Sequence, residues 1–140
     1  MTNVAAALGA LCGLLKDKAG LSAAVGRPAG AVGIHIWAWQ LLPSPAAMAP
    51  PPMRPTGGGG GPVSRPMELR VLLVSSGTQA ALDDLARAHQ VLVDNPVLQI
   101  SDSRVQIVPS SLSAAELAAV FTAGQVPLSL SSSFTLLCSP

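Results

Sequence analysis

The fold is decided by residues 78–98, TQAALDDLARAHQVLVDNPVL, which have the pattern of one amphipathic helix with a defined end. Its apolar side chains recur at helical spacing along one face: Leu82, Leu85, Ala86, His89, Leu92 and Val93. Thr78 is placed to cap the first turn, because its hydroxyl can accept a hydrogen bond from a backbone N–H that has no partner there. Pro96 ends the helix at Asn95, because a residue that precedes a proline is driven out of the helical region.

The charged side chains of this stretch indicate which face points to solvent. Asp83 and Arg87 are four residues apart and are expected to pair on the exposed side. Leu85 and Leu92 should then be buried against a sheet. Asp83 and Asp84 lie in the N-terminal half, where the helix dipole favours negative charge.

The strand that precedes this helix and the residues that end it resemble those of a known family. Residues 69–74, LRVLLV, form an apolar strand that leads into it, and residues 91–98, VLVDNPVL, form its ending. Residues 68–98 are similar to the N-terminal domain of the cap proteins of contractile injection systems, which are phage-tail-like particles. In that family a strand runs into a helix with a closely similar ending.

The resemblance implies a structural protein, the cap or tail terminator at the end of the tube and sheath. Caps of that family form six-fold rings, so a homohexamer is expected, with the tube and sheath proteins of the particle as its partners. No cofactor, small-molecule substrate or nucleic acid is implied. Assembly would take place in the bacterial cytoplasm, in a contractile particle that can be released from the cell. The alternatives are a small α+β regulatory or ligand-binding domain and, third, an enzyme.

The composition favours an assembly over an isolated molecule. The chain has 140 residues, which suits a single domain spanning residues 1–140, although it is shorter than we expect for the cap family. Charged residues make up 11% and hydrophobic residues 49%, against roughly 25% charged in typical domains. Part of the apolar surface should therefore be covered by other subunits. The net charge of +1 does not indicate the strongly basic surface that nucleic-acid-binding proteins carry. Cys12 and Cys138 are expected to be buried thiols.

Residues 2–19 have the pattern of a helix that begins near Thr2 or Asn3 and ends before Gly20. Its apolar stripe consists of Val4, Leu8, Leu11, Cys12 and Leu15. The opposite face is rich in alanine and glycine, which favours packing in a core over lying on a membrane surface. Lys16 follows the apolar run, the wrong order for a secretory signal, and no apolar run reaches the ~20 residues of a membrane span. Residues 21–32 are expected to form a loop.

Residues 33–42, GIHIWAWQLL, alternate as a strand with two apolar faces. One face carries Ile34, Ile36, Ala38 and Leu42, and the other carries His35, Trp37, Trp39 and Leu41. Such a strand is either central or covered by a neighbouring subunit. Trp37 and Trp39 are therefore candidates for an interface, since aromatic residues supply much of the binding energy of interfaces. The alternative is that the chain's own first helix covers them.

Residues 43–66 contain eight prolines and five consecutive glycines, a composition that excludes a helix or a central strand. They are expected to form a long, mobile loop that a partner could order. Pro50-Pro51-Pro52 favours polyproline II geometry. The glycines lack the lysine and Ser/Thr of a phosphate-binding loop. Met53 and Arg54 in this loop are further interface candidates.

The remaining elements predict an α+β fold, and the resemblance implies that it is of phage tail-terminator type. Strands are expected at residues 68–75, 104–108 and 128–138, and a short helix opens at a capping box of Ser113 and Glu116 and ends at Gly124. In the last strand the inward positions are Leu128, Leu130, Phe134, Leu136 and Cys138. The result is a mixed or antiparallel four-stranded sheet with about three helices.

No catalytic constellation is visible in the sequence. His35 and His89 lie on apolar patterns and are expected to be packed or rim histidines. Cys12 and Cys138 are far from both in sequence, so no close metal-ligand spacing exists. No G-x-S-x-G nucleophile motif occurs. These patterns favour a structural protein over an enzyme.

Overall fold

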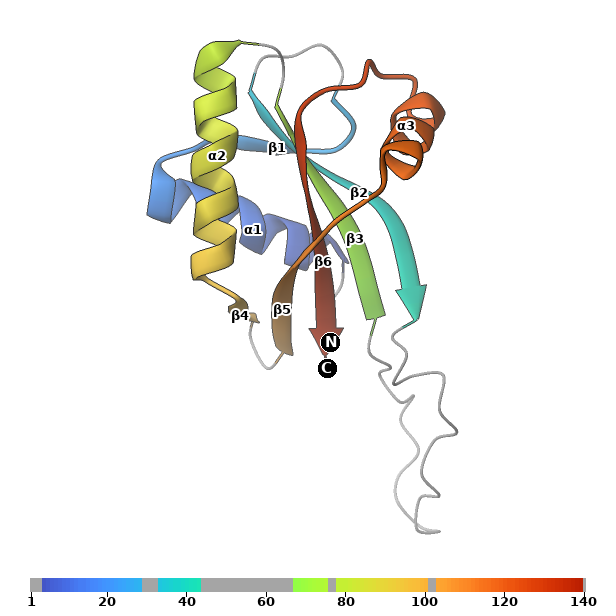
Figure 1. Cartoon of the computed structure of the whole chain (residues 1–140). Coiled ribbons are helices and arrows are strands. Elements are labelled where there is room, and N and C mark those ends of the chain that lie inside the picture. The colour runs from blue at the N-terminus through green and yellow to red at the C-terminus, as the bar shows by residue number, and fades with distance from the viewer. Residues whose placement is uncertain (1–3, 29–32, 44–66, 76–77, 101–102, 140) are drawn as a thin grey trace, which may run out of the picture.

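The computed structural model describes residues 4–28, 33–43, 67–75, 78–100 and 103–139 (Figure 1). Within these ranges there are three helices and six strands. The elements in chain order are α1 (Val4–Ala19), β1 (Ala23–Val25), β2 (Ile34–Pro43), β3 (Met67–Ser75), α2 (Gln79–Asp94), β4 (Val97–Ile100), β5 (Ser103–Ser110), α3 (Ala114–Ala123) and β6 (Ser131–Ser139). No helix in the described ranges is long and apolar enough to cross a membrane.

The strands form a single mixed sheet in the order β1-β2-β3-β6-β5-β4. The β1–β2 pair is parallel, and the other neighbouring pairs are antiparallel. The predicted α+β class with a mixed sheet is confirmed, with six strands in the described residues where four were expected. The two additional strands are the edge strands, β1 inside the predicted loop and β4 directly after Pro96. Each is too short to show an alternating pattern in the sequence.

The side chains divide into two buried clusters on opposite faces of the sheet. The larger cluster lies beneath α1 and α2 and includes Leu69, Val71 and Leu73 of β3. The smaller cluster lies beneath α3 and includes the intervening residues Leu72 and Val74. Strand β3 therefore has two apolar faces, and each face has its own helical cover.

Helix α2 begins and ends where the sequence predicts. Thr78 Oγ1 accepts a hydrogen bond from the backbone N–H of Ala81 at 3.1 Å, and the helix stops at Asp94. Leu85 and Leu92 are buried, with 4% and 1% of their surface exposed, as expected.

The buried stripe of α2 is rotated from the predicted one. It consists of Ala81, Leu85, Ala88 and Leu92. Leu82, Ala86 and Val93 are exposed, so their predicted burial is wrong. The alanines at the centre of the stripe carry small side chains, which lets α2 lie close against its neighbours.

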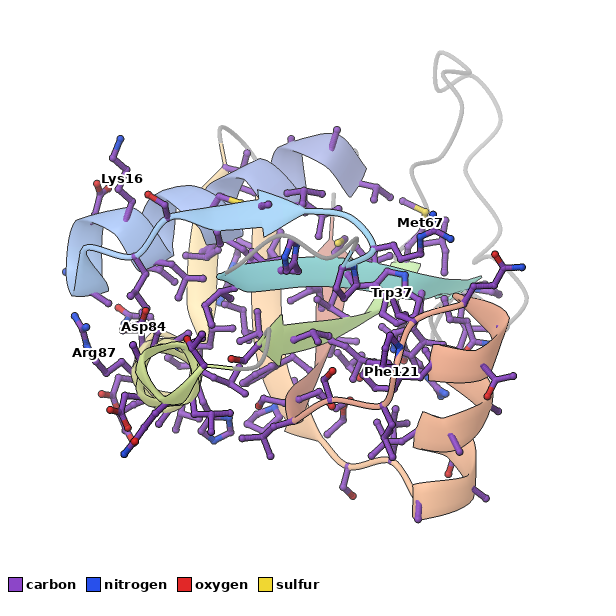
Figure 2. All side chains as sticks on the ribbon, turned by 90° about the horizontal axis from the view of Figure 1, so that it is seen from above. Lys16, Trp37, Met67, Asp84, Arg87 and Phe121 are labelled. Carbon is purple, nitrogen blue, oxygen red and sulfur yellow. The ribbon has the colours of Figure 1, made fainter. Side chains whose placement is uncertain are left out.

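The ion pair on α2 also differs from the expected one. Arg87 Nη1 lies 3.4 Å from Asp84 Oδ1, and not beside Asp83 (Figure 2). The other guanidinium nitrogen, Nη2, donates a hydrogen bond to the carbonyl of Ala19 at the end of α1. This second bond draws Arg87 towards α1.

Helix α1 packs in the main cluster through Leu8, Leu11 and Leu15, as predicted, and also through Ala7, which the predicted stripe did not include. Val4 and Cys12 of that stripe are partly buried at its edge. It is followed by Gly20 with φ of +66°, a backbone conformation that favours glycine. The predicted caps Thr2 and Asn3 lie outside the described residues.

The C-terminal part of the chain follows the prediction with two corrections. The Ser113–Glu116 capping box is present at the start of α3, and Gly124 caps its end. Strand β5 is longer than expected, and β6 starts at Ser131. Leu128 and Leu130 are 66% and 60% exposed, so their predicted inward orientation is wrong: they precede the strand, where no sheet face covers them. The other predicted inward positions, Phe134, Leu136 and Cys138, are buried.

The predicted proline- and glycine-rich loop falls almost entirely on residues 44–66, which lie outside the described residues. Its expected mobility and the positions of Met53 and Arg54 therefore stay predictions. What the structure shows is the pair of strands that the segment joins, with Pro43 of β2 opposite Met67 of β3.

Candidate functional site

The histidines lie in packed surroundings. His35 is buried on β2. His89 on α2 is half-buried, and its Nδ1 lies 2.5 Å from Ser132 Oγ, with its ring centroid 5.3 Å from that of Phe134. Among the described residues no carboxylate forms an ion pair with His89 to complete a triad. The described residues also contain no cluster of three or more histidine, cysteine or acidic side chains that could hold a metal ion.

The cysteines are free thiols with little nucleophilic character. Cys138 is buried and Cys12 is half-buried, with its Sγ 3.7 Å from the carbonyl oxygen of Ala23. Burial raises the pKa of both thiols, because removing a thiolate from water is unfavourable. Both therefore remain protonated at neutral pH, and the reactive thiolate form is disfavoured.

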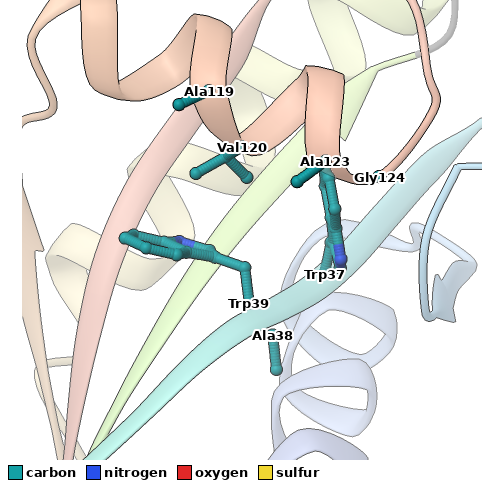
Figure 3. A pocket seen from close by; sticks show the side chains of 7 residues that line it. All are labelled: Trp37, Ala38, Trp39, Ala119, Val120, Ala123 and Gly124. Atoms are coloured by element: carbon teal, nitrogen blue, oxygen red, sulfur yellow. The ribbon is translucent and has the colours of Figure 1, made fainter.

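The feature with the clearest capacity to bind something is a pocket between β2 and α3, here called the tryptophan pocket (Figure 3). Its volume is about 400 Å³. It is lined by Trp37, Ala38, Trp39, Ala119, Val120, Ala123 and Gly124. The lining is largely aromatic and aliphatic, so the pocket suits an apolar group.

A β-bulge in β2 shapes the floor of the pocket. The register with β3 shifts between Ala38 and Gln40, which leaves Trp39 as the extra residue. Figure 3 shows the side chains of Trp37 and Trp39 both on the α3 side of the strand, with Ala38 turned the other way.

The bulge also corrects the predicted faces at the end of β2. Beyond it, Leu41 pairs with Leu69 and Leu42 pairs with Glu68. Residues paired across neighbouring strands project from the same face. Leu41 and Leu42 therefore exchange the faces that simple alternation predicts.

Trp37 forms the wall of the pocket where α3 ends. Its ring packs edge-on against Phe121, with centroids 5.7 Å apart and ring planes at 73° (Figure 2). A Cβ atom at Gly124 would lie 2.5 Å from Cη2 of Trp37, closer than real side chains approach. Glycine at position 124 therefore allows the indole to lie against the end of α3. Arg27 Nη1 donates a hydrogen bond to the carbonyl of Gly124 at 3.0 Å and ties the same corner to the loop after β1.

Trp39 forms the floor of the pocket and carries an unused donor. The guanidinium carbon of Arg70 lies 5.8 Å from the centroid of its ring, a distance suited to a cation–π contact. Its indole Nε1 is shielded from solvent and has no hydrogen-bond partner among the described residues. A buried donor without a partner costs about 1–3 kcal/mol. Such a group favours a ligand that brings an acceptor.

The structure thus brings together two of the four predicted interface residues, Trp37 and Trp39. A helix of the same chain covers them in part, but this helix is α3, on the opposite face of the sheet from α1. The alternative that α1 covers them is therefore wrong, and their role in an interface stays a prediction. Met53 and Arg54 lie outside the described residues.

The sequence alone did not identify the α3 side of this pocket or Arg70. One signal was available: β2 and β3 both have two apolar faces, so a sheet containing them needs helices on both sides. The short apolar helix at residues 114–123 was the element left to supply the second layer. No local pattern marked the bulge at Trp39.

Comparison with known structures gives a match to the fold. The sheath/tube terminator of PVC, an extracellular contractile injection system, in its extended state, superposes with a TM-score of 0.70 at 13% sequence identity. The alignment covers 98% of this chain and 56% of the terminator, so this chain spans little more than half the length of that protein. No protein-family model matches the sequence, and no curated protein matches it. The predicted resemblance to cap proteins of contractile injection systems is confirmed at the level of the fold.

Proposed function

We propose that this protein is a terminator of a contractile injection system, a structural subunit that caps the end of the tube and sheath. The observation that supports the proposal is the fold match over 98% of the chain. It agrees with the independent resemblance of residues 68–98 to the cap family. The chemistry of the described residues fits a structural role, because the titratable side chains are packed or dispersed and do not converge on a pocket.

The mechanism is geometric. Subunits close into a ring, expected to be a homohexamer, which covers the last layer of tube and sheath and stops further polymerisation. A ring subunit buries surface on two sides, which suits a chain with 11% charged residues. The partners are the tube and sheath proteins of the particle. Assembly takes place in the bacterial cytoplasm, within a particle that can be released from the cell.

The test is whether the protein limits the length of its own tube. Tube and sheath proteins from the same particle are polymerised with increasing amounts of the purified chain, and lengths are measured by negative-stain electron microscopy. A terminator shortens the particles and appears as a cap at one end. Particles of unchanged length, with no density added at either end, would contradict the proposal.

The alternative is a small α+β regulatory or ligand-binding domain, and the tryptophan pocket is the observation in its favour. Its volume of about 400 Å³ lies within the range of small-molecule sites, roughly 300–1,000 Å³. A ligand-binding domain would remain a monomer or dimer and would leave tube length unchanged. The same experiment therefore separates the two functions.

A further inference from the structure

We propose that the tryptophan pocket binds a segment in polyproline II conformation, and that the segment is residues 43–66 of a second copy of this chain. The inference deepens the proposed function and rests on it, since it assigns a contact between neighbouring subunits of the ring. The pocket is its starting point: it has two tryptophans and a wall of small side chains, and the indole N–H of Trp39 has no partner in the part of the chain that the structure describes.

The lining of the pocket matches the chemistry of a polyproline ligand. A polyproline II helix has no internal hydrogen bonds, so it presents apolar rings and free carbonyl groups together. Proteins recognise it with grooves lined by aromatic side chains. Here Trp37 and Trp39 offer flat apolar surfaces, and Ala119 and Ala123 leave room above them.

Trp39 provides the polar part of the recognition. Its Nε1 has no hydrogen-bond partner among the described residues, and the indole is half-buried. A carbonyl of an incoming segment can accept this hydrogen bond after a small rotation of the ring. The guanidinium of Arg70 lies over the ring of Trp39, and the carbonyl groups of an incoming segment can also accept hydrogen bonds from it. A polyproline carbonyl suits these donors well, because it carries no competing intramolecular bond.

The sequence of the chain contains a ligand of this kind. Residues 43–66 hold eight of its thirteen prolines, including Pro50-Pro51-Pro52, and two charged residues, Arg54 and Arg65. Its proline-rich part around Pro50-Pro51-Pro52 loses little conformational entropy on binding in extended form, since proline already restricts the backbone.

A second copy of the chain can supply the bound segment, because each chain carries one pocket and one segment. A contact that joins the segment of one subunit to the pocket of the next is head-to-tail, and such contacts close into rings when the rotation is right. The competing occupant is the chain's own segment, which starts at Pro43, four residues beyond Trp39. The experiment must distinguish these two arrangements.

The experiment is a complementation between two variants of the full chain. The pocket variant is Ala123→Leu, which fills the pocket from an exposed position on α3 and keeps the segment. The segment variant replaces Pro50, Pro51 and Pro52 with serine and keeps the pocket. Sedimentation velocity then measures each variant alone and their equimolar mixture. The matched control is Ala118→Leu, the same change at an exposed α3 position that does not line the pocket.

We expect the wild type and the Ala118→Leu control to assemble, and each of the two test variants to remain monomeric. Their mixture should form one-to-one dimers and nothing larger, because one intact pocket and one intact segment remain in the pair. Assembly of both variants to the wild-type size would overturn the inference while leaving the terminator function standing. The inference would also be overturned if the wild type assembles but the mixture of the two variants contains no dimer.

A labelled peptide of residues 43–66 provides the second measurement. Its fluorescence anisotropy should rise on titration with the segment variant, and Ala123→Leu introduced into that variant should weaken binding at least tenfold. Failure to bind would overturn the polyproline site. A wild type that stays monomeric, while the segment variant binds the peptide, would place each segment in its own chain's pocket and overturn the contact between copies.

Discussion

The face of the sheet beneath α1 and α2 and the face beneath α3 differ in how completely they are closed. In the described residues, eighteen side chains form the buried cluster of the first face, and three, Leu72, Val74 and Phe121, form that of the second. Around those three, Trp37 and Trp39 remain half-buried at the edge of a pocket. The first face therefore supplies stability, and the second retains the capacity to bind.

This difference follows from the size of the helical cover. α1 and α2 have sixteen residues each, whereas α3 has ten. A ten-residue helix spans ~15 Å and cannot cover a sheet face of this width. The residues left at its border are aromatic in β2, which suits contact with another chain. The first three of the following predictions compare the two faces, and the last compares two sides of α2.

The largest effect is expected for Phe134→Ala on the first face. Phe134 is fully buried on β6 opposite Val71, where the surrounding core is closed and cannot collapse onto the cavity. The substitution should lower the free energy of unfolding by about 3–5 kcal/mol, measured by urea denaturation followed by circular dichroism. A loss below 1 kcal/mol would show that this core is not closely packed.

The same substitution on the second face, Phe121→Ala, should act more locally. Phe121 anchors α3 against Leu72, Val74 and the ring of Trp37. We expect a loss of about 3 kcal/mol, since the small cluster can relax. Amide protons of α3 should lose their protection in hydrogen exchange while those of β3 and β6 keep theirs. Equal loss of protection in all three elements would contradict the separation of the two faces.

A smaller effect should follow from Gly124→Ala, which tests the fit of Trp37 against the end of α3. The added methyl group would meet the indole, so stability should fall by about 1–3 kcal/mol and tryptophan fluorescence should shift. The control is Gly13→Ala in the interior of α1, where a Cβ meets nothing within 4 Å. That change should stabilise the protein by about 1 kcal/mol. Equal effects at the two glycines would contradict the close contact at Trp37.

The smallest effect is expected for Leu82→Ala on the exposed flank of α2. Leu82 is 39% exposed, whereas Leu85, three residues further, is 4% exposed. Leu82→Ala should cost less than about 1 kcal/mol, against about 2–5 kcal/mol for Leu85→Ala. Thermal unfolding of the pair checks the orientation of α2. A larger loss of stability for Leu82→Ala than for Leu85→Ala would contradict the observed orientation of α2.

The elements that the sequence predicted well carry their own local signals. The Thr78 cap and the stop at Asn95-Pro96 define α2, and the Ser113–Glu116 box defines the start of α3. These signals depend on hydrogen bonds between residues a few positions apart, so the surrounding fold changes them little.

The features that the sequence did not predict are set by packing between distant elements. The buried stripe of α2 is turned towards Ala81 and Ala88, and Arg87 bonds across to Ala19 of α1. The bulge at Trp39 reverses the faces of the residues that follow it, with no local pattern to mark it. Which face α3 covers depends on the whole sheet. The sequence therefore identified the residues of β2 that line the pocket, Trp37 and Trp39, but not those of α3.

The proposed closure of this chain into a ring is tested most directly by imaging the purified protein. Negative-stain class averages of the full chain should show closed rings with six-fold symmetry, and sizing should give a mass of six chains. Particles of one or two chains at every concentration, with no rings in the images, would contradict the account.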